Sequence, residues 1–389
     1  MIAIKHVQVI HNEGISTNHG VLIEGHTIKG IYPLDEMPHE DITETIDGQN
    51  HYLAPGFIDI HTHGNSGFDT MDADLEGLKT IAKTHFKQGV TSFLATTITS
   101  SKTALNQALK TGAKYQQTQS KTDPLAHMLG FYFEGPYFNE VKKGAQPKQT
   151  LQAPNLAALK SYLKNSQNLI KVVALAPELM GASELIKYLK QKGITVAMAH
   201  TDATYDTALK GIDAGITLAT HMYNGMRGFT HREPGALGAA LLDDRVMSEL
   251  IVDGLHLHPK AVDLAIKAKG YARLVLISDA IRAAGLNDGD YDLGGQTITL
   301  KDNACLLPDG TLAGSTLNIK LAIKNLIEMN KIPLHKAIQM ATYNPAKAIG
   351  LEDRLGQIKP GFQADLVFLN EALDVKQVIK AGRLHQLKS

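Results

Sequence analysis

Eight short apolar runs, separated by longer stretches, constrain the fold of this chain more than any other feature. The runs cover residues 56–60, 91–96, 128–133, 170–175, 195–199, 216–220, 249–252 and 273–278. Amphipathic segments of helical character lie between most of them, for example 75–88, 101–119, 155–165 and 182–192. Eight buried strands with intervening helices favour a (β/α)8 (TIM) barrel of α/β class over an open doubly wound sheet.

Both ends of the chain have the pattern of β structure outside this barrel. Alternating or short apolar segments occur at residues 2–10, 20–24 and 27–32, and again at 364–369 and 378–384. We therefore expect one small β-sandwich domain, formed by residues 1–53 together with 355–389, and a barrel from 54 to 354. After the eighth run, the sequence near 290–312 predicts an inserted β hairpin with its turn at Pro308-Asp309-Gly310. Helices are expected at 317–329 and 333–349.

Polar residues suited to metal binding follow several of the apolar runs. They are His61 and His63 after the first run, Glu134 after the third, His200 after the fifth, His221 after the sixth and Asp279 after the eighth. Each has an ordinary alternative explanation: His200 as a core histidine, Glu134 as a turn residue, and Asp279 as a helix cap. The carboxyl ends of barrel strands converge on one face, however, so all six are expected to meet in one pocket.

This set of side chains limits the metal. Four imidazoles with two carboxylates suit zinc, iron, manganese or cobalt, and the usual thiolate pattern of structural zinc is missing from the set. A carboxylate between two ions could bridge them, and water shared by two ions is strongly acidified.

Composition narrows the class of protein. The 39 basic and 39 acidic residues balance, which disfavours a broad nucleic-acid or membrane surface but leaves room for a local site for a phosphorylated metabolite. The single cysteine, Cys305, excludes an intrachain disulfide and is interpreted as a small buried hydrophobe. The first residues do not resemble a signal peptide, and no apolar run approaches the roughly 20 residues of a membrane helix. A cytoplasmic enzyme or binding protein is expected.

Short motifs spread along nearly the whole chain match one known family. They extend from Ala-Pro-Gly-Phe-Ile-Asp at 54–59 to Gly-Phe-Gln-Ala-Asp-Leu at 361–366. The most specific are Phe-Glu-Gly-Pro (133–136), Lys-Lys-Gly (142–144), His-Met-Tyr-Asn-Gly-Met (221–226), Arg-Glu-Pro-Gly (232–235), Asp-Gly-Leu-His (253–256) and Leu-Ala-Gly-Ser (312–315). With these motifs the chain resembles the amidohydrolase superfamily, and within it the N-acetylglucosamine-6-phosphate deacetylases.

The resemblance implies a reaction: hydrolysis of the N-acetyl group of N-acetylglucosamine 6-phosphate to acetate and glucosamine 6-phosphate, in amino-sugar catabolism and cell-wall sugar recycling. It also implies roles for residues. Glu134, His200 and His221 would hold the principal metal, and Asp279 would act as general base and then acid. The sugar phosphate would be contacted by Asn224, the backbone at Gly225, His256, and the segment at Ala313. Arg232 would reach the phosphate in the neighbouring subunit, which implies a homodimer.

Two features distinguish this chain within the family it resembles. Some members lack the first-strand histidines and bind one metal, whereas His61 and His63 are both present here, so we expect a second ion held by these two and Asp279. Some members carry a histidine after the Lys-Lys-Gly motif, where this chain has Gln146; an amide positions substrate but does not exchange protons near neutral pH. No lysine ends a strand where a carbamylated bridge would be expected, which leaves bridging to Glu134 and disfavours dihydroorotases and hydantoinases. The segment 141–150 is a candidate lid.

Two other functions stay open at this point. One is another metal-dependent hydrolase of the same barrel, such as a deaminase or a D-amino-acid deacylase; Arg232 with His256 argues against it, because a substrate without phosphate does not require them. The other is a non-catalytic barrel that serves as an interaction protein, from which a loss of ligands would be expected.

Overall fold

The computed structural model describes residues 1–387, and its larger part is a (β/α)8 barrel. The eight parallel strands are β6 (Phe57–Thr62), β9 (Val90–Thr97), β10 (His127–Glu134), β11 (Ile170–Leu175), β12 (Thr195–Met198), β13 (Ile216–Ala219), β14 (Met247–Leu250) and β15 (Leu274–Leu276). Each pairs with the next one along the chain. Beyond the ladder, the Asp279 amide donates to the His61 carbonyl at 2.9 Å, which joins the last strand end to the first. The predicted barrel is confirmed.

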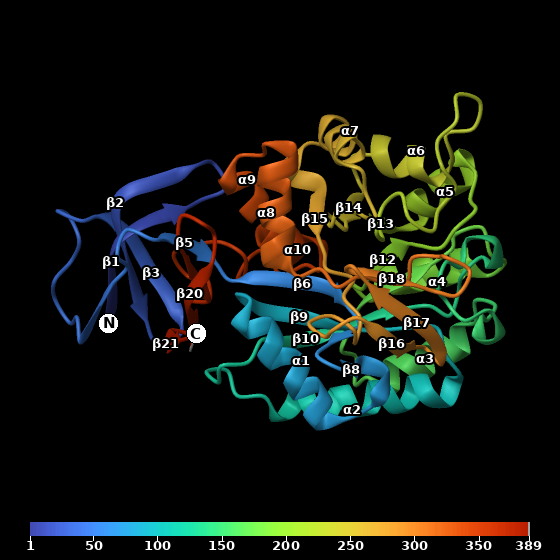
Figure 1. Ribbon diagram of the computed structural model, residues 1–389, viewed down its shortest axis with the longest axis horizontal. Helices are drawn as coiled ribbons and strands as arrows, with labels where there is room; N and C mark the ends of the chain where they lie inside the picture. The colour runs from blue at the N-terminus through green and yellow to red at the C-terminus, as the bar shows by residue number, and fades with distance from the viewer. Residues whose placement is uncertain (388–389) are drawn as a thin grey trace.

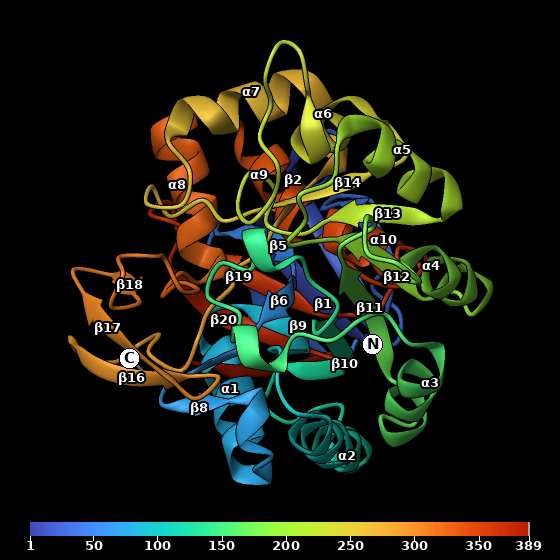
Figure 2. The ribbon, with the colours of Figure 1, turned by 90° about the vertical axis from the view of Figure 1, so that its right-hand side faces the viewer.

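Helices surround the strands, as Figure 2 shows in a view into the barrel. They are α1 (Leu75–Lys87), α2 (Lys102–Thr118), α3 (Leu156–Asn165), α4 (Ala182–Gln191), α5 (Tyr205–Ala214), α6 (Gly235–Leu242), α7 (Pro259–Lys269), α8 (Ile319–Asn330), α9 (Leu334–Ala341) and α10 (Tyr343–Ala348). In α1, Leu78, Ile81 and Phe86 are buried at helical spacing, and the Asp74 side chain caps the amino end. The apolar faces of the helices and the strands form one continuous core.

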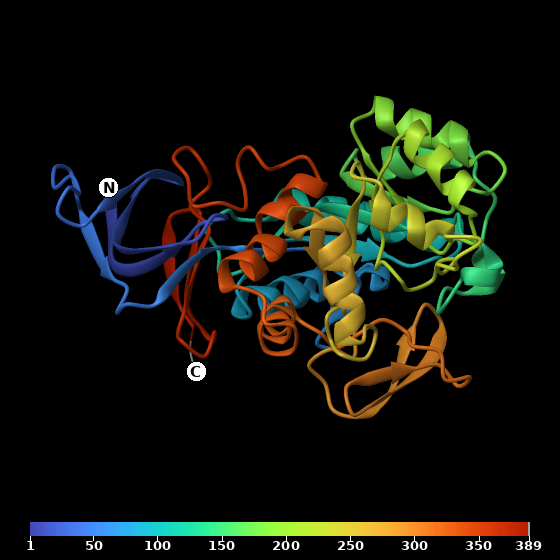
Figure 3. The same ribbon diagram turned by 90° about the horizontal axis from the view of Figure 1, so that it is seen from above.

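The two ends of the chain form one eight-stranded sheet beside the barrel (Figures 1 and 3). Its strands are β1 (Ile2–Ile10), β2 (Ile15–Glu24), β3 (Thr27–Pro33), β4 (Glu44–Asp47), β5 (Tyr52–Pro55), β19 (Leu366–Leu369), β20 (Val375–Lys380) and β21 (Arg383–Gln386). At the β3 edge, the Ile28 amide donates to the carbonyl of Phe362, which lies just before β19, at 2.8 Å. The sheet encloses its own apolar core, as expected of a small β domain built from both ends. The exact boundaries of that domain stay a prediction.

The insertion after the eighth strand differs from the predicted hairpin. It is a three-stranded antiparallel sheet of β16 (Gly289–Leu293), β17 (Gln296–Lys301) and β18 (Ala304–Leu306). The connections are Gly294-Gly295 and Asp302-Asn303, all four with positive φ, as two-residue hairpin turns require. The turn at 308–310 instead closes a short bridge between Leu306 and Leu312. The sequence analysis missed the two-residue turns at Gly294-Gly295 and Asp302-Asn303, which divide the segment into three short strands.

Other departures from the sequence-based expectation are small. The helix predicted over 333–349 is interrupted at Thr342, whose φ of −134° and ψ of −77° are not helical. Pro345 lacks the amide hydrogen that a continuous helix would use, which favours a new helix start here. The seventh strand begins at Met247, two residues before the predicted run. No helix within residues 1–387 has the length and apolar character that crossing a membrane requires.

Candidate active site and metal centre

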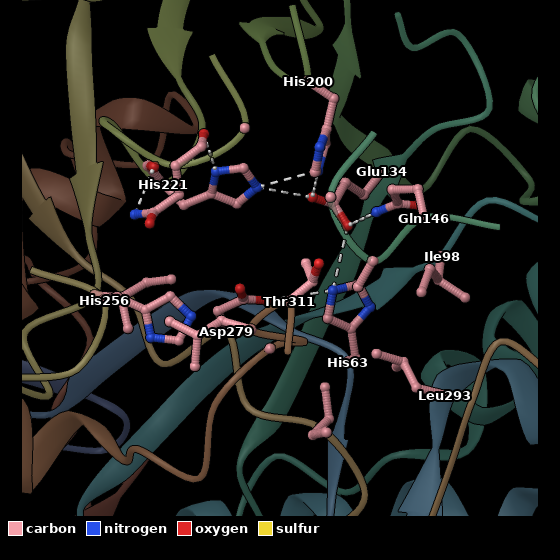
Figure 4. A pocket seen from close by; sticks show the side chains of 18 residues that line it. His63, Ile98, Glu134, Gln146, His200, His221, His256, Asp279, Leu293 and Thr311 are labelled. Atoms are coloured by element: carbon pink, nitrogen blue, oxygen red, sulfur yellow. Dashed lines mark hydrogen bonds and ion pairs between the residues drawn. The ribbon is translucent and has the colours of Figure 1, made fainter. Parts of the chain in front are cut away.

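A cavity of about 210 Å³ opens at the carboxyl ends of the barrel strands. Figure 4 shows the side chains around it; five of the six predicted ligands line it, namely His63, Glu134, His200, His221 and Asp279. The sixth, His61, is completely buried directly beneath them. The structure thus brings together residues that are up to 218 positions apart in the chain (61 to 279). Their roles as ligands stay a prediction.

Three of these residues leave their strands with an unusual backbone. His200, His221 and Asp279 have φ values of 43°, 30° and 49°, in the left-handed region. This conformation is uncommon for residues other than glycine and occurs preferentially at functional sites. At each position the backbone turns from the strand into a loop, and the side chain at the turn lines the cavity.

Glu134, His200 and His221 form the first of two ligand groups. The Nδ1 atoms of His200 and His221 face the carbonyls of Lys142 at 3.0 Å and Asn224 at 3.1 Å, so each Nδ1 carries the hydrogen. Both Nε2 lone pairs therefore converge, 3.3 Å from each other and 3.4 and 3.3 Å from Oε1 of Glu134. Such electron-rich atoms repel one another unless a cation lies among them.

His61, His63 and Asp279 form the second group. Oδ1 of Asp279 lies 3.5 Å from Nε2 of His61 and 3.3 Å from Nε2 of His63. Glu134 lies between the two groups, because its Oε2 is 3.2 Å from His63 Nε2 while its Oε1 faces the first group. This is the position that a bridging carboxylate requires.

These residues fit a divalent cation. Nε2 of His61 is buried and accepts no hydrogen bond from any group in residues 1–387, although two carboxylates lie close to it. Nitrogen and oxygen donors without sulfur suit zinc, iron, manganese and cobalt. Both groups could hold an ion, as expected, and the number and identity of the ions stay predictions.

Without a cation, the neighbouring charges shift the pKa values of the ligands in the second group. Burial lowers the pKa of His61, but the Glu249 and Asp279 carboxylates outweigh burial and raise it to about 9. Burial also lowers the pKa of His63, but hydrogen bonds with Asp279 and Glu134 outweigh burial and raise it well above its usual range. Burial raises the pKa of Asp279, yet the neighbouring His61 and His63 hold it below its usual value. Asp279 is therefore ionised near neutral pH.

Metal uptake is expected to depend steeply on pH. At neutral pH a cation entering the second group displaces protons from His61 and His63, so its affinity rises with pH. Metal affinity should increase up to about tenfold per pH unit for each proton released. The part of this increase that comes from His61 should end near pH 9, the pKa of its ring. Calorimetric titration of the metal-free protein with Zn²⁺, in buffers of different ionisation enthalpy, measures both affinity and proton release. Affinity that does not change with pH would contradict this ligand assignment.

Three of the predicted substrate-binding residues line the same cavity as the ligand groups. Asn224, Gly225 and His256 line it. The Asp253 carboxylate accepts from Nδ1 of His256 at 2.7 Å and so fixes the ring orientation. Gly225 has a φ of 60°, and a Cβ atom there would lie 2.8 Å from His200 Nδ1, so only glycine fits beside that ligand.

Gln146 contacts the metal cluster directly. Its Nε2 donates to Glu134 Oε2 at 2.8 Å, while its Oε1 accepts from the Thr99 amide at 2.9 Å. These two bonds fix both the amide of Gln146 and the carboxylate of Glu134. An amide at this position therefore orients a ligand, in addition to the substrate contact that the sequence predicts.

Two predicted residues do not line the cavity of this chain. Arg232 is exposed in the loop between β13 and α6, which projects from the barrel in Figure 2. Ala313 is buried in the apolar core of the insertion, and its amide donates a hydrogen bond to the Cys305 carbonyl at 3.0 Å. The neighbours of Ala313, Leu312 and Gly314, line the cavity instead.

Glu249 is a buried site residue that the sequence interpretation missed. It lies in β14 with no exposed surface, and its Oε2 accepts from Nδ1 of His61 at 3.0 Å and from the His221 amide at 3.1 Å. A signal was available, because Glu249 is the first residue of the apolar run predicted at 249–252, and a charged residue in a buried strand is normally paired or close to a metal. The apolar wall formed by Ile98, Ile281 and Leu293 was also not foreseen.

A (β/α)8 barrel that gathers imidazoles and carboxylates at its strand ends defines a class of metal-dependent barrel enzymes. Residues 52–385 match the model of the Amidohydrolase family. This chain belongs to that family.

Its relatives include deacetylases of amino-sugar phosphates. The N-acetylglucosamine-6-phosphate deacetylase of Lysinibacillus sphaericus is 38% identical over 346 residues, which cover 89% of this chain and 88% of that protein. The N-acetylgalactosamine-6-phosphate deacetylase of Escherichia coli O157:H7 is 37% identical, with 97% of both chains covered. Among solved structures, the N-acetylglucosamine-6-phosphate deacetylase of Pasteurella multocida has a TM-score of 0.92 and 30% identity over 99% of both chains.

Proposed function

We propose that this hydrolase cleaves the N-acetyl group of N-acetylglucosamine 6-phosphate and releases acetate and glucosamine 6-phosphate, in amino-sugar catabolism and cell-wall sugar recycling. The observation that carries the proposal is the ionised Asp279, which belongs to one of two metal-ligand groups in a cavity that Asn224 and His256 also line. Relatives named for this reaction match about nine tenths of the chain and support it.

The side chains of the site divide the work of amide hydrolysis. A divalent cation, when bound by these ligands, polarises the amide carbonyl and lowers the pKa of water to about 7. Asp279 accepts a proton from the attacking water and returns it to the departing nitrogen. His256 and Asn224, which line the same cavity, hold the sugar phosphate, and this remote binding aligns the amide with Asp279.

The finer features of the enzyme are part of the same proposal. Two ions per subunit are favoured because both ligand groups are complete, with zinc, iron, manganese or cobalt as candidates. The projecting loop supports a homodimer in which Arg232 reaches the phosphate in the neighbouring subunit. One cysteine in 389 residues fits a reducing compartment, and we propose the cytoplasm.

N-acetylgalactosamine 6-phosphate is a second candidate substrate. The relative named for this sugar covers 97% of this chain at 37% identity, similar to the identity of the N-acetylglucosamine relatives. The two sugars differ in the configuration at carbon 4, so the choice depends on hydrogen bonds to one hydroxyl group. Comparing kcat/KM for acetate release from the two sugar phosphates tests the proposal. A preference for the galactose epimer would overturn the glucosamine assignment and leave the deacetylase reaction standing.

The 6-phosphate is expected to dominate recognition. Arg232→Ala should lower kcat/KM for the phosphorylated sugar about 10- to 100-fold, because a charge-assisted hydrogen bond contributes about 1.5–3 kcal/mol. Hydrolysis of unphosphorylated N-acetylglucosamine should be slow and insensitive to the change. Arg245→Ala is the matched control, since Arg245 is an exposed arginine paired with Asp213 and Asp243.

Size-exclusion chromatography with light scattering on the same samples measures the oligomeric state. A monomer would contradict the shared site. Equal rates on phosphorylated and unphosphorylated sugars would favour a deacylase or deaminase of the same barrel.

A further inference from the structure

Glu249 is the one buried carboxylate within residues 1–387 that contacts both ligand groups without facing the cavity. One oxygen, Oε2, accepts from Nδ1 of His61 at 3.0 Å and from the backbone amide of His221 at 3.1 Å. Its other oxygen, Oε1, has no hydrogen-bond partner within the same residues. Burying a carboxylate is costly unless it is paired, and this one is paired with a residue of each ligand group, which points to a task beyond packing.

The contact with His61 determines which nitrogen can bind a cation. A hydrogen on Nδ1, held by Glu249, leaves the Nε2 lone pair free, and that atom lies 3.5 Å from Asp279 Oδ1 and 3.7 Å from Glu134 Oε1. One face of the ring stacks on Tyr132, with centroids 4.4 Å apart. Glu249 and Tyr132 therefore leave His61 a single ring orientation.

The other ligands do not depend on Glu249 in this way. The His221 ring is oriented by the Asn224 carbonyl, and Glu249 reaches only its backbone. His200 is oriented by the Lys142 carbonyl. His63 has no partner for its buried Nδ1 within residues 1–387, so His61 is the only imidazole of the second group whose Nδ1, the nitrogen away from the other ligands, is held by a carboxylate.

We propose that Glu249 is the positioning residue that makes the His61–His63–Asp279 group competent to bind its ion, while the Glu134–His200–His221 group binds without it. This inference rests on the two-ion site proposed above. A carboxylate behind a ligating imidazole fixes its tautomer and raises its basicity, and losing such a partner typically reduces metal affinity about 10- to 100-fold.

The test compares Glu249→Ala and Glu249→Gln with the unmodified protein. Each is prepared metal-free, titrated with Zn²⁺ by calorimetry, and analysed for metal content after dialysis at fixed free Zn²⁺. In the alanine variant we expect one binding step about 10- to 100-fold weaker and the other within about threefold of the unmodified protein. Glutamine keeps an oxygen that accepts from His61 Nδ1, so its loss should be smaller. Glu178→Gln is the control. The Glu178 carboxylate accepts hydrogen bonds from the Asn139 side chain and from the Asp202 backbone amide, near the first group, and it does not contact His61.

Several results would overturn the inference. Two unchanged binding steps in Glu249→Ala would show that His61 needs no anchor, and equal weakening of both steps would show that Glu249 supports the whole cluster. If the alanine variant does not fold by circular dichroism, the glutamine variant decides by the same comparison of its two steps. An unmodified protein that binds one ion would overturn both the second site and this inference, whereas acetate release by that one-ion enzyme would leave the proposed reaction intact.

Discussion

Asp279→Asn is expected to lower kcat for acetate release about 10²- to 10⁴-fold while the protein still folds, because it removes the ionised carboxylate to which we assign the proton transfer. Asparagine keeps the size of the side chain but cannot accept a proton near neutral pH. The substrate contacts at Asn224 and His256 are untouched, so KM should change much less than kcat. Steady-state assays on the 6-phosphorylated sugar measure both constants.

Asp290→Asn is the matched control for this prediction. Asp290 is an exposed aspartate of the insertion that accepts from Thr299, and its change should leave kcat unaltered. Metal content measured on both variants separates loss of the base from loss of an ion. Near-native turnover by Asp279→Asn would rule out the proton-transfer role.

Glu134→Gln is expected to have the largest effect on metal binding. Glu134 faces His200 and His221 with one oxygen and His63 with the other, so a neutral amide weakens both ligand groups at once. We expect metal affinity to fall by more than about 100-fold, and activity to fall in parallel. This loss exceeds the typical effect of removing a residue that only hydrogen-bonds to a metal ligand. Elemental analysis after dialysis measures the metal content directly.

The same variant also makes a stability prediction. A ligand that binds only the folded state raises the melting temperature, so added Zn²⁺ should stabilise the unmodified protein and have little effect on Glu134→Gln. Glu140→Gln, at an exposed glutamate paired with Lys148, is the control and should keep the stabilisation by Zn²⁺. Full stabilisation of Glu134→Gln by Zn²⁺ would contradict the central position of this carboxylate.

The barrel could be predicted from local pattern because each strand and helix carries its own periodicity. The insertion was predicted less well: its strands are so short that turn chemistry at Gly294-Gly295 and Asp302-Asn303 decides their arrangement, and the more conspicuous proline turn misled the prediction. The break before Tyr343 was missed for a similar reason, since one local backbone change ends a helix without altering the apolar pattern.

The sequence by itself determined which side chains stand at the strand ends, because strand periodicity and chain order place His61, His63, Glu134 and Asp279 there wherever a parallel barrel closes. Only the tertiary structure decided how these ends face one another. That Glu134 lies between two groups, that Glu249 stands behind His61, and that Arg232 stays outside the cavity depend on distances across the barrel. Those distances follow from the tilt and stagger of all eight strands together, which no single segment of the chain encodes.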